Sequence, residues 1–484
     1  MMWFAWMWMS VGALAQEATE PQDTPEVPEE QTVEADDATT GVDADEVATP
    51  TTEADAATGG EEEAAETAMA VESIDVEATA DAPDTAPEPP PERREAWEKV
   101  GLGWGGLPFA NYSSDSKFGF GVIGNIYGYD GDTDPYKWTL GFLIYFNTTG
   151  GQSHRIDFDM LDVGGLPLRI NSRLAFDVVR NDWYCGLGTT NSCPVADAEA
   201  AASAAGLTDD AYDTAVRDYY KVRYLRPSGF LNFRYMLSDK PHRLEVMAGW
   251  WGEYYLPGDL KFREPYTPSL YGSDFPEGEQ GFSSNLQVGL MLDNRDNEPA
   301  PMTGYWGEVS IRGASPVWGG TWSYFGYNLT MRTYLSHPKY RKFVWAQRLV
   351  HDGIVGNPNT IEMSRAGGSV IYDFFGGQRA GRGVRYAGVN GRVRFLAQEE
   401  ARWTFLDLQK SKVPFAMTLI GFGDFGVWAE NWNTLTSEPR NPLAGFGGGL
   451  RLAFNQNFII RADVGFSQRE DYAPGIYLDV GNLF

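Results

Sequence analysis

The feature that most constrains the fold is an alternation of apolar with polar or small residues, which recurs from residue 97 to residue 484. In the segment 457–468, for example, Ile460 and Val464 share one face while Arg461 and Asp463 share the other. A period of two predicts a β-strand with one apolar face. Turn residues separate the segments. The predicted strands are 97–107, 117–129, 136–148, 151–163, 167–181, 218–237, 241–256, 281–295, 303–314, 321–337, 341–356, 391–408, 412–428, 443–455, 457–468 and 474–484.

The gaps between these sixteen segments give a second test of the pattern. The long gaps, 182–217, 257–280, 357–390 and 429–442, follow the fifth, seventh, eleventh and thirteenth segments. All four positions are odd, so in an antiparallel sheet all four loops lie on one rim. Closed bacterial membrane barrels have an even strand number and short turns on one side. The sequence therefore predicts an all-β fold, a sixteen-stranded antiparallel transmembrane β-barrel over residues 97–484.

The final segment supports the same fold. In 474–484, Ile476, Leu478 and Val480 share one face, and the segment runs to Phe484. This pattern is typical of the closing strand of a bacterial outer-membrane barrel. An ordinary soluble sheet whose last strand ends in Phe is the alternative reading.

Charge is distributed unevenly along the chain. Residues 16–96 hold 26 Asp or Glu against two basic residues, Arg93 and Arg94, which is a net charge of −24. The rest of the chain therefore carries only −5 of the total net charge of −29. Aromatic residues are 14% of the chain, yet none lies between Trp8 and Trp97. The body is thus nearly neutral and rich in aromatics, as a barrel with interfacial girdles would be. It lacks the basic stripe that binding to nucleic acid requires.

The N-terminal part predicts export and disorder. Residues 1–15 form a short apolar run that ends in Ala-Leu-Ala, as in a signal peptide, although the usual basic residues are missing and the start codon is open to question. Residues 16–96 are rich in Glu, Ala, Thr and Pro. They cannot bury enough apolar surface to fold, so we expect a disordered acidic segment in the periplasm. Its role is either that of a spacer or the binding of a basic periplasmic partner.

Few residues point to chemistry. Cys185 and Cys193 lie eight positions apart in a polar stretch, and they are either a disulfide of an exported protein or two unrelated thiols. None of the four His lies in a nucleophile motif, so we expect no enzymatic activity. The acidic run 130–134 is better explained as a hairpin turn than as a Ca²⁺ site. We expect neither a metal nor a cofactor.

Three stretches carry a resemblance to a known family. The first, 290–305, contains Asp293, Arg295 and Asp296, then a Pro-rich turn and Gly304 before Tyr305. The other two are Phe-Gly-Gly-Gln-Arg-Ala-Gly-Arg-Gly at 375–383 and Gly-Phe-Gly-Asp-Phe-Gly at 421–426. Together they resemble the BamA/TamA family of outer-membrane barrel assembly factors, also called bacterial surface antigens, and its two-partner-secretion relatives. The resemblance covers about 280–484 well and 97–280 only as a general barrel.

The resemblance implies a site inside the barrel. In the family, the sixth outer loop folds back into the lumen, and an Arg of that loop pairs with an Asp of the thirteenth strand. Carried over to this sequence, the loop is 357–390, and Arg382, which Gly383 follows, would pair with Asp424. Arg379 and Arg385 are alternatives, as is a solvated loop with no such pair. The sequence departs from the family where Gly381 replaces Val or Ile and Val384 replaces an aromatic residue.

The family also implies a function. Its members carry polypeptide-transport-associated domains before the barrel, and residues 16–96 have no core to build one. The resemblance implies insertion or translocation of an unfolded client protein in the bacterial outer membrane, in contact with its lipid. The route would be a seam between 99–107 and 476–484. Gly101, Gly103 and Gly105 weaken packing across it, and Pro108 cannot donate a ladder hydrogen bond. The alternative function is a structural barrel or narrow pore that moves no protein and exposes its loops.

Overall fold

The computed structural model describes residues 100–484 apart from short gaps at 115, 134–135, 188–192, 241, 259–267, 277, 299, 338–341, 370, 386–389, 409–414, 438–441, 455–457 and 481. The predicted signal peptide 1–15 and acidic segment 16–96 lie outside the described residues.

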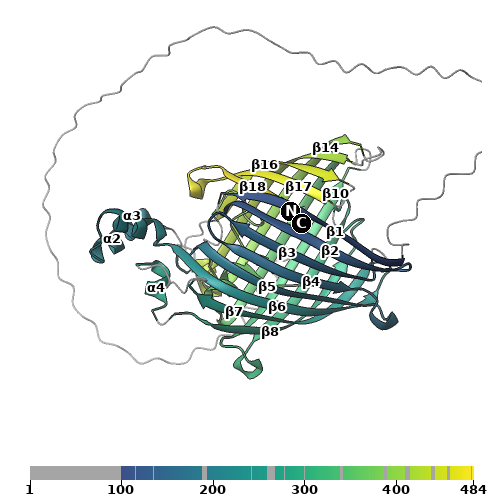
Figure 1. Cartoon of the computed structure of the whole chain (residues 1–484), viewed down its shortest axis with the longest axis horizontal. Coiled ribbons are helices and arrows are strands. Elements are labelled where there is room, and N and C mark those ends of the chain that lie inside the picture. Colours follow the sequence, from purple (N-terminus) through teal and green to yellow (C-terminus); the bar gives the residue numbers. More distant parts are fainter. Residues whose placement is uncertain are drawn as a thin grey trace, which may run out of the picture. The chain divides into compact units, whose positions relative to one another are not determined.

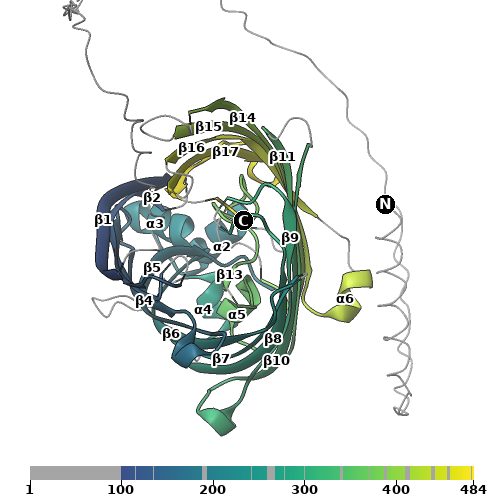
Figure 2. The same ribbon diagram turned by 90° about the vertical axis from the view of Figure 1, so that its right-hand side faces the viewer.

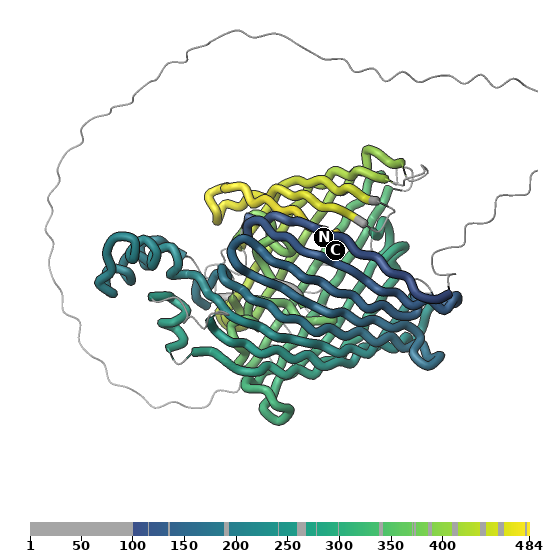
Figure 3. The backbone as a smooth tube through the Cα atoms, in the orientation of Figure 1, coloured from purple at the N-terminus to yellow at the C-terminus, as the bar shows by residue number. Residues whose placement is uncertain are grey.

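The described chain folds into a closed antiparallel barrel of sixteen strands, which confirms the predicted fold class (Figures 1 and 3). Each strand pairs with its neighbour in sequence, and β1 meets β18 to close the wall. The wall strands are β1 (Val100–Ser113), β2 (Lys117–Asp130), β3 (Trp138–Asn147), β4 (Gln152–Met160), β5 (Leu168–Trp183), β6 (Lys221–Ser238), β7 (Arg243–Pro257), β8 (Gly281–Asp293), β9 (Gly304–Ala314), β10 (Ser323–Ser336), β11 (Phe343–Asn357), β14 (Val393–Asp407), β15 (Phe415–Ala429), β16 (Leu443–Phe454), β17 (Phe458–Ser467) and β18 (Gly475–Val480).

The alternation of each strand sorts side chains between the two faces of the wall. In β15, Phe422 and Asp424 are 7% and 1% exposed and face the lumen, while Leu419 and Phe425 are each 45% exposed and face outward. The outward face is mostly Leu, Val, Ile, Phe and Trp, and the inward face holds nearly all of the charged residues of the described strands. An apolar outside is what lipid requires, and closure satisfies the backbone hydrogen bonds that a free edge in hydrocarbon would leave unmade.

All four long connections lie on one rim, as the spacing predicted. They are 184–220 after β5, 258–280 after β7, 358–392 after β11 and 430–442 after β15. We call this side the long-loop rim and the opposite side the short-turn rim.

The long connections carry short helices that the sequence analysis did not predict. These elements are α2 (Val195–Ala204) and α3 (Asp209–Asp218) after β5, α4 (Leu270–Asp274) after β7, α5 (Thr360–Ser364) after β11 and α6 (Trp432–Ser437) after β15. Figure 1 shows α2, α3 and α4 beyond one end of the barrel, and Figure 2 shows α6 outside the ring of strands. Within the described residues, every helix is too short or too polar to cross a bilayer.

The connections after β5 and β7 form a packed cap on the long-loop rim. Cys185 and Cys193 are joined by a disulfide at the start of the first connection. Tyr184, Tyr255 and Tyr271 pack together with Ile361 of α5, and all four are at most 5% exposed. The cap therefore contacts the connection after β11 as well as the barrel wall.

A half-buried carboxylate ties this cap to α5. Glu279 accepts hydrogen bonds from the backbone N–H of Thr360 at 3.0 Å, from its hydroxyl at 2.6 Å and from the hydroxyl of Tyr271 at 3.2 Å. Burial raises the pKa of Glu279, while the Thr360 donors favour its charged form.

Candidate functional site

The connection 358–392, which we call the lumenal loop, folds into the barrel instead of extending away from it (Figure 2). It contains α5 and a two-stranded sheet of β12 (Arg365–Ala366) and β13 (Tyr372–Asp373). Phe374 and Phe375 are 0% and 1% exposed, and they pack against Leu396 of β14 and Trp428 of β15. An apolar core thus fixes the loop against one side of the lumen.

Arg382 is the most heavily bonded residue of this loop. Its Nε and Nη2 donate to the two carboxylate oxygens of Asp424 at 3.0 Å each, and its backbone N–H donates to the same carboxylate at 2.9 Å. Its guanidinium lies 3.5 Å from the centroid of the Phe422 ring. Both partners of the ion pair are fully buried. A bidentate pair with a ring stacked on the guanidinium suits Arg and no other residue.

Further charges surround this pair. Arg382 Nη1 also donates to Glu400 at 2.7 Å and to Asp463 at 3.4 Å. Glu400 accepts from Arg402 at 2.9 Å, and Arg451 contacts both Glu400 and Asp463. Arg461 lies 3.9 Å from Asp463 and forms an ion pair with Asp479 at 2.8 Å, so four guanidinium groups face four carboxylates. This balance offsets the cost of burying charge, and loss of any one group would leave another uncompensated.

Two glycines let the loop approach the wall. Gly383 has a φ of 93°, and a Cβ on it would lie 2.6 Å from the backbone N of Phe466. Its own N–H donates to the Tyr477 hydroxyl at 3.0 Å. Gly381 has a φ of 85°, and the ring of Phe375 occupies the space of its missing Cβ. The departure from Val or Ile at this position therefore fits the packing of Phe375.

The alternative arginines have other partners. The backbone carbonyl of Arg379 accepts from Arg348 at 2.8 Å. Arg385 forms an ion pair with Glu470 at 2.7 Å and stacks over Trp183. The structure thus brings Arg382, and neither neighbour, to Asp424.

The first half of the lumenal loop is bound to the opposite wall, and sequence reasoning missed these contacts. Arg365 donates to both oxygens of Glu253 on β7, at 2.7 and 2.8 Å. The N–H of Ser369 donates to Glu308 on β9 at 2.7 Å. Because Glu253 and Arg365 are 112 positions apart, no local motif marks them. The one available signal was that polar residues stand at lumen-facing positions of the predicted strands.

The motif at 293–304 forms a tight turn on the short-turn rim. Arg295 binds both oxygens of Asp293, at 2.9 and 2.8 Å. Asp296 accepts from the backbone N–H of Met302 at 2.9 Å and closes the turn. Gly304 has a φ of 102°, and a Cβ there would collide with the carbonyl of Asn294. These residues shape the turn and lie apart from the lumenal loop.

The seam between β1 and β18 is the weakest junction of the wall. Among the described residues, the two strands pair only through Tyr112 with Leu478 and Ser113 with Tyr477. Two further hydrogen bonds follow, from the Ser114 backbone N–H to the carbonyl of Ile476 at 3.1 Å and from the Ile476 backbone N–H to the Ser114 hydroxyl at 3.0 Å. By comparison, β17 and β18 share six pairs, and β1 and β2 share fourteen.

The predicted position of this seam was wrong. It was placed between 99–107 and 476–484, but Gly101, Gly103 and Gly105 pair with β2 alone in the described structure. β1 continues through Pro108 to Ser113, so its contact with β18 lies at the long-loop rim. The edge of β1 from Val100 to Asn111 has no described strand beside it.

The closing strand is also shorter than predicted, because it ends at Val480. Phe484 instead lies in the lumen, 6% exposed, against Tyr334 and Ala346 of β10 and β11. Its carbonyl oxygen accepts from Arg402 at 3.1 Å, and its ring lies 5.3 Å from the guanidinium of Arg348. The last residues thus leave the wall and bind across the lumen.

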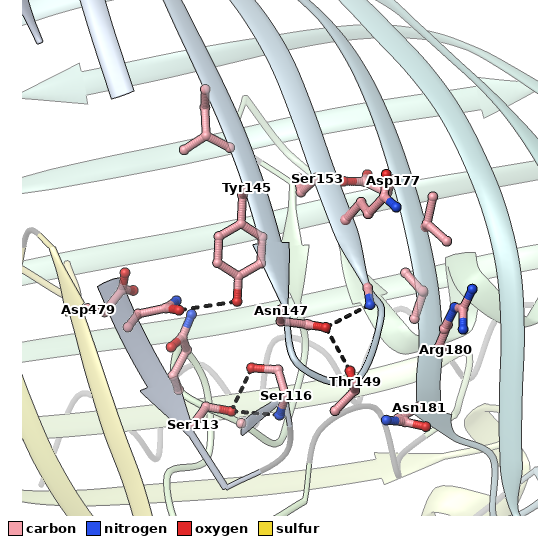
Figure 4. Close-up of a pocket in the computed structure, with 18 of the residues that line it drawn as sticks. Ser113, Ser116, Tyr145, Asn147, Thr149, Ser153, Asp177, Arg180, Asn181 and Asp479 are labelled. Atoms are coloured by element: carbon pink, nitrogen blue, oxygen red, sulfur yellow. Dashed lines mark hydrogen bonds between the residues drawn. The ribbon is translucent and has the colours of Figure 1, made fainter. Parts of the chain in front are cut away.

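A cavity of about 460 Å³ remains between the lumenal loop and the wall formed by β1–β5 (Figure 4). Figure 4 shows Ser113 of β1 and Asp479 of β18 at its border, so the cavity adjoins the seam. Tyr145 donates to Asn111 at 3.2 Å within it. In the described part of the chain, no three His, Cys, Asp or Glu side chains are grouped to hold a metal ion.

Comparison with known proteins finds the same architecture at low sequence identity. CdiB from Escherichia coli superposes with a TM-score of 0.52 at 10% identity, covering 79% of this chain and 63% of that chain. BamA from Haemophilus ducreyi lacking POTRA domains 1–3 has a TM-score of 0.49 at 13% identity, covering 81% of this chain and 76% of that chain. CdiB from Acinetobacter baumannii has a TM-score of 0.47 at 13% identity, covering 78% and 59%.

No protein-family model and no curated protein matches the sequence. The chain spans less than two thirds of the length of the E. coli CdiB chain. The likeness to that protein establishes the fold, a sixteen-stranded barrel of the kind seen in CdiB.

Proposed function

We propose that this protein is an integral barrel of the bacterial outer membrane that inserts or translocates an unfolded client protein, without a catalytic step, through the seam between β1 and β18. The observation that carries the proposal is the two-pair junction of these strands. BamA and CdiB, the barrels it resembles in fold, belong to the same class of function that the sequence motifs suggest.

The free edge of β1 supplies the physical argument. Its backbone N–H and C=O groups from Val100 to Asn111 have no described partner on that side, and unpaired backbone groups in hydrocarbon cost several kcal/mol each. Val100, Leu102 and Trp104 on this edge are 81%, 77% and 86% exposed. A client strand that adds to the edge would satisfy these groups and cover these side chains.

The filled lumen favours this lateral route over a central one. The lumenal loop is bound to both sides of the wall, through Arg382 and Arg365. The cavity that remains, about 460 Å³, is in the size range of a small-molecule site. An extended polypeptide needs a passage along the whole barrel, so it would require the loop to leave.

The test locks the seam in its observed register. Tyr112→Cys with Leu478→Cys places a disulfide between paired residues of β1 and β18. Leu290→Cys with Val309→Cys does the same across β8 and β9 and serves as the control. Folding of a urea-unfolded eight-stranded outer-membrane barrel into vesicles is followed by its heat-modifiable gel migration. We expect the oxidised seam variant to lose activity and regain it on reduction, and activity that survives oxidation contradicts the proposal.

The cavity supports a second candidate, a narrow pore that moves no protein. Single-channel recording separates the two. A steady open conductance in the absence of client, together with no acceleration of client folding, favours the pore.

A further inference from the structure

Glu399 stands out on the outer surface of the barrel. Its chain neighbours Gln398 and Glu400 are 0% and 1% exposed and face the lumen, so Glu399 faces outward. It pairs with Gln347 on β11 and with Gly423 on β15, midway along β14. Across the described wall strands, it is the one Asp, Glu, Lys or Arg that faces outward more than three residues from a strand end.

The local hydrogen bonds satisfy this carboxylate without neutralising it. Trp345 Nε1 donates to one oxygen at 2.7 Å, and Gln347 Nε2 donates to the other. Both donors are uncharged, so a negative charge remains on a surface that otherwise suits lipid. A charged residue at this depth is costly, and such residues typically serve a function with a partner of opposite charge.

The surface beside Glu399 is also low. A Cβ added at Gly421 or Gly423 on β15 would meet no atom within 4 Å. Ala397 and Ala401 flank Glu399 along β14 and pair with Phe425 and Gly421. Small residues allow a second membrane-embedded backbone to come close, as they do at the interfaces of membrane helices.

Large side chains border this low surface. Trp345 and Trp403 are 43% and 51% exposed, and Phe425 and Phe446 are 45% and 52% exposed. Glu399 and the small residues around it thus form a recessed strip of surface, which aromatic side chains border on both sides. Lipid tails make no favourable interaction with the carboxylate, whereas a protein segment with a cation would form an ion pair with it.

We propose that the outer face of β11, β14 and β15 is a docking surface for a membrane-embedded segment of another protein, which places a Lys or Arg beside Glu399. A second copy of this chain fits poorly. No outward Lys or Arg is found in the middle of the described strands, so two such faces would bring two carboxylates together. The proposal does not depend on the insertion function.

The experiment is photo-cross-linking of the full chain in its native membrane. A p-benzoylphenylalanine at Ala401 reports on the docking surface, and one at Val288, which is 50% exposed on β8, serves as the control position. Glu399→Gln preserves shape and removes the charge. Normal heat-modifiable migration of each variant shows that the barrel is folded.

We expect a protein adduct at Ala401 whose yield falls at least about fivefold in Glu399→Gln, with no change at Val288. The partner peptide should carry a Lys or Arg. When that residue is exchanged for Glu in the partner, the adduct should return in the Glu399→Lys variant of this chain. An adduct with lipid alone or with a second copy of this chain, an equal yield in Glu399→Gln, or no adduct at all would overturn the proposal.

Discussion

Arg382 and Asp424, 42 positions apart in sequence, form a fully buried bidentate ion pair with both guanidinium-to-carboxylate distances at 3.0 Å. Arg382 comes from a loop and Asp424 from the barrel wall, so the pair joins two parts of the fold that no backbone ladder connects. Glu400 and Asp463 share the same guanidinium. This contact fixes the second half of the lumenal loop against the wall, while Arg365 fixes the first half.

Replacing this arginine should release the second half of the loop. Arg382→Ala leaves buried carboxylates with one cation fewer, and breaking a buried pair in this way costs about 3–5 kcal/mol. We expect a lower urea midpoint of unfolding in detergent micelles and faster hydrogen exchange over the loop. Arg385→Ala is the matched control. Its partner Glu470 lies at the rim and the arginine side chain is 51% exposed, so the loss should stay within about 1 kcal/mol. Equal effects of the two changes would refute the special role of Arg382.

Gly383→Ala tests the close approach of the loop to β17. A residue with a Cβ is strained at a φ of 93°, and the Cβ would also meet the backbone of Phe466. Strain and overlap together should cost about 2–4 kcal/mol in the free energy of unfolding. Gly421→Ala adds the same methyl group at an outward position with open space, and it should change stability by no more than about 0.5 kcal/mol. Urea unfolding of both variants measures the difference in their free energies of unfolding. Equal values would show that the loop does not approach β17 closely at Gly383.

The disulfide between Cys185 and Cys193 should stabilise the cap without affecting the barrel. It closes a short loop with a sequence separation of 8, for which chain entropy gives about 2–3 kcal/mol. Replacing both cysteines with Ser should therefore speed proteolysis between β5 and β6 and leave barrel unfolding unchanged. Loss of barrel stability to the same extent would show that cap and wall unfold together.

The periodicity of the sequence was sufficient for the wall. Alternation identifies the apolar face of each strand. The parity of the long gaps, such as 182–217 and 357–390, places the long loops on one rim. Periodicity could not predict where β1 and β18 end. The first strand was predicted to end at 107, before Pro108, yet an edge strand tolerates a missing N–H, and β1 runs to Ser113. Periodicity likewise cannot tell an outward Phe from one that turns into the lumen, as Phe484 does.

Contacts within the lumen were predictable only where a motif marked them. Arg382 and Asp424 carried a family pattern, although Arg379 and Arg385 stayed open until the structure placed them. Arg365 and Glu253 carried none, because their pairing depends on how the loop crosses the barrel. The helix α2 was missed for a related reason, since it sits in an Ala-rich stretch without an apolar stripe. The apolar residues Tyr212, Ala215 and Val216 of α3 do share one face, so helical periodicity could have marked that helix.

The central claim is that a client strand adds to the free edge of β1, and cysteine mapping of a stalled client measures this most directly. Single cysteines at Leu102 and Trp104 are tested against a cysteine scan of the last strand of an eight-stranded barrel client halted during insertion. The account predicts disulfides in one register, so that moving the barrel cysteine by two residues moves the client partner by two. Disulfides without a fixed register, or disulfides formed instead with a cysteine at Tyr145 in the lumenal cavity, would contradict it.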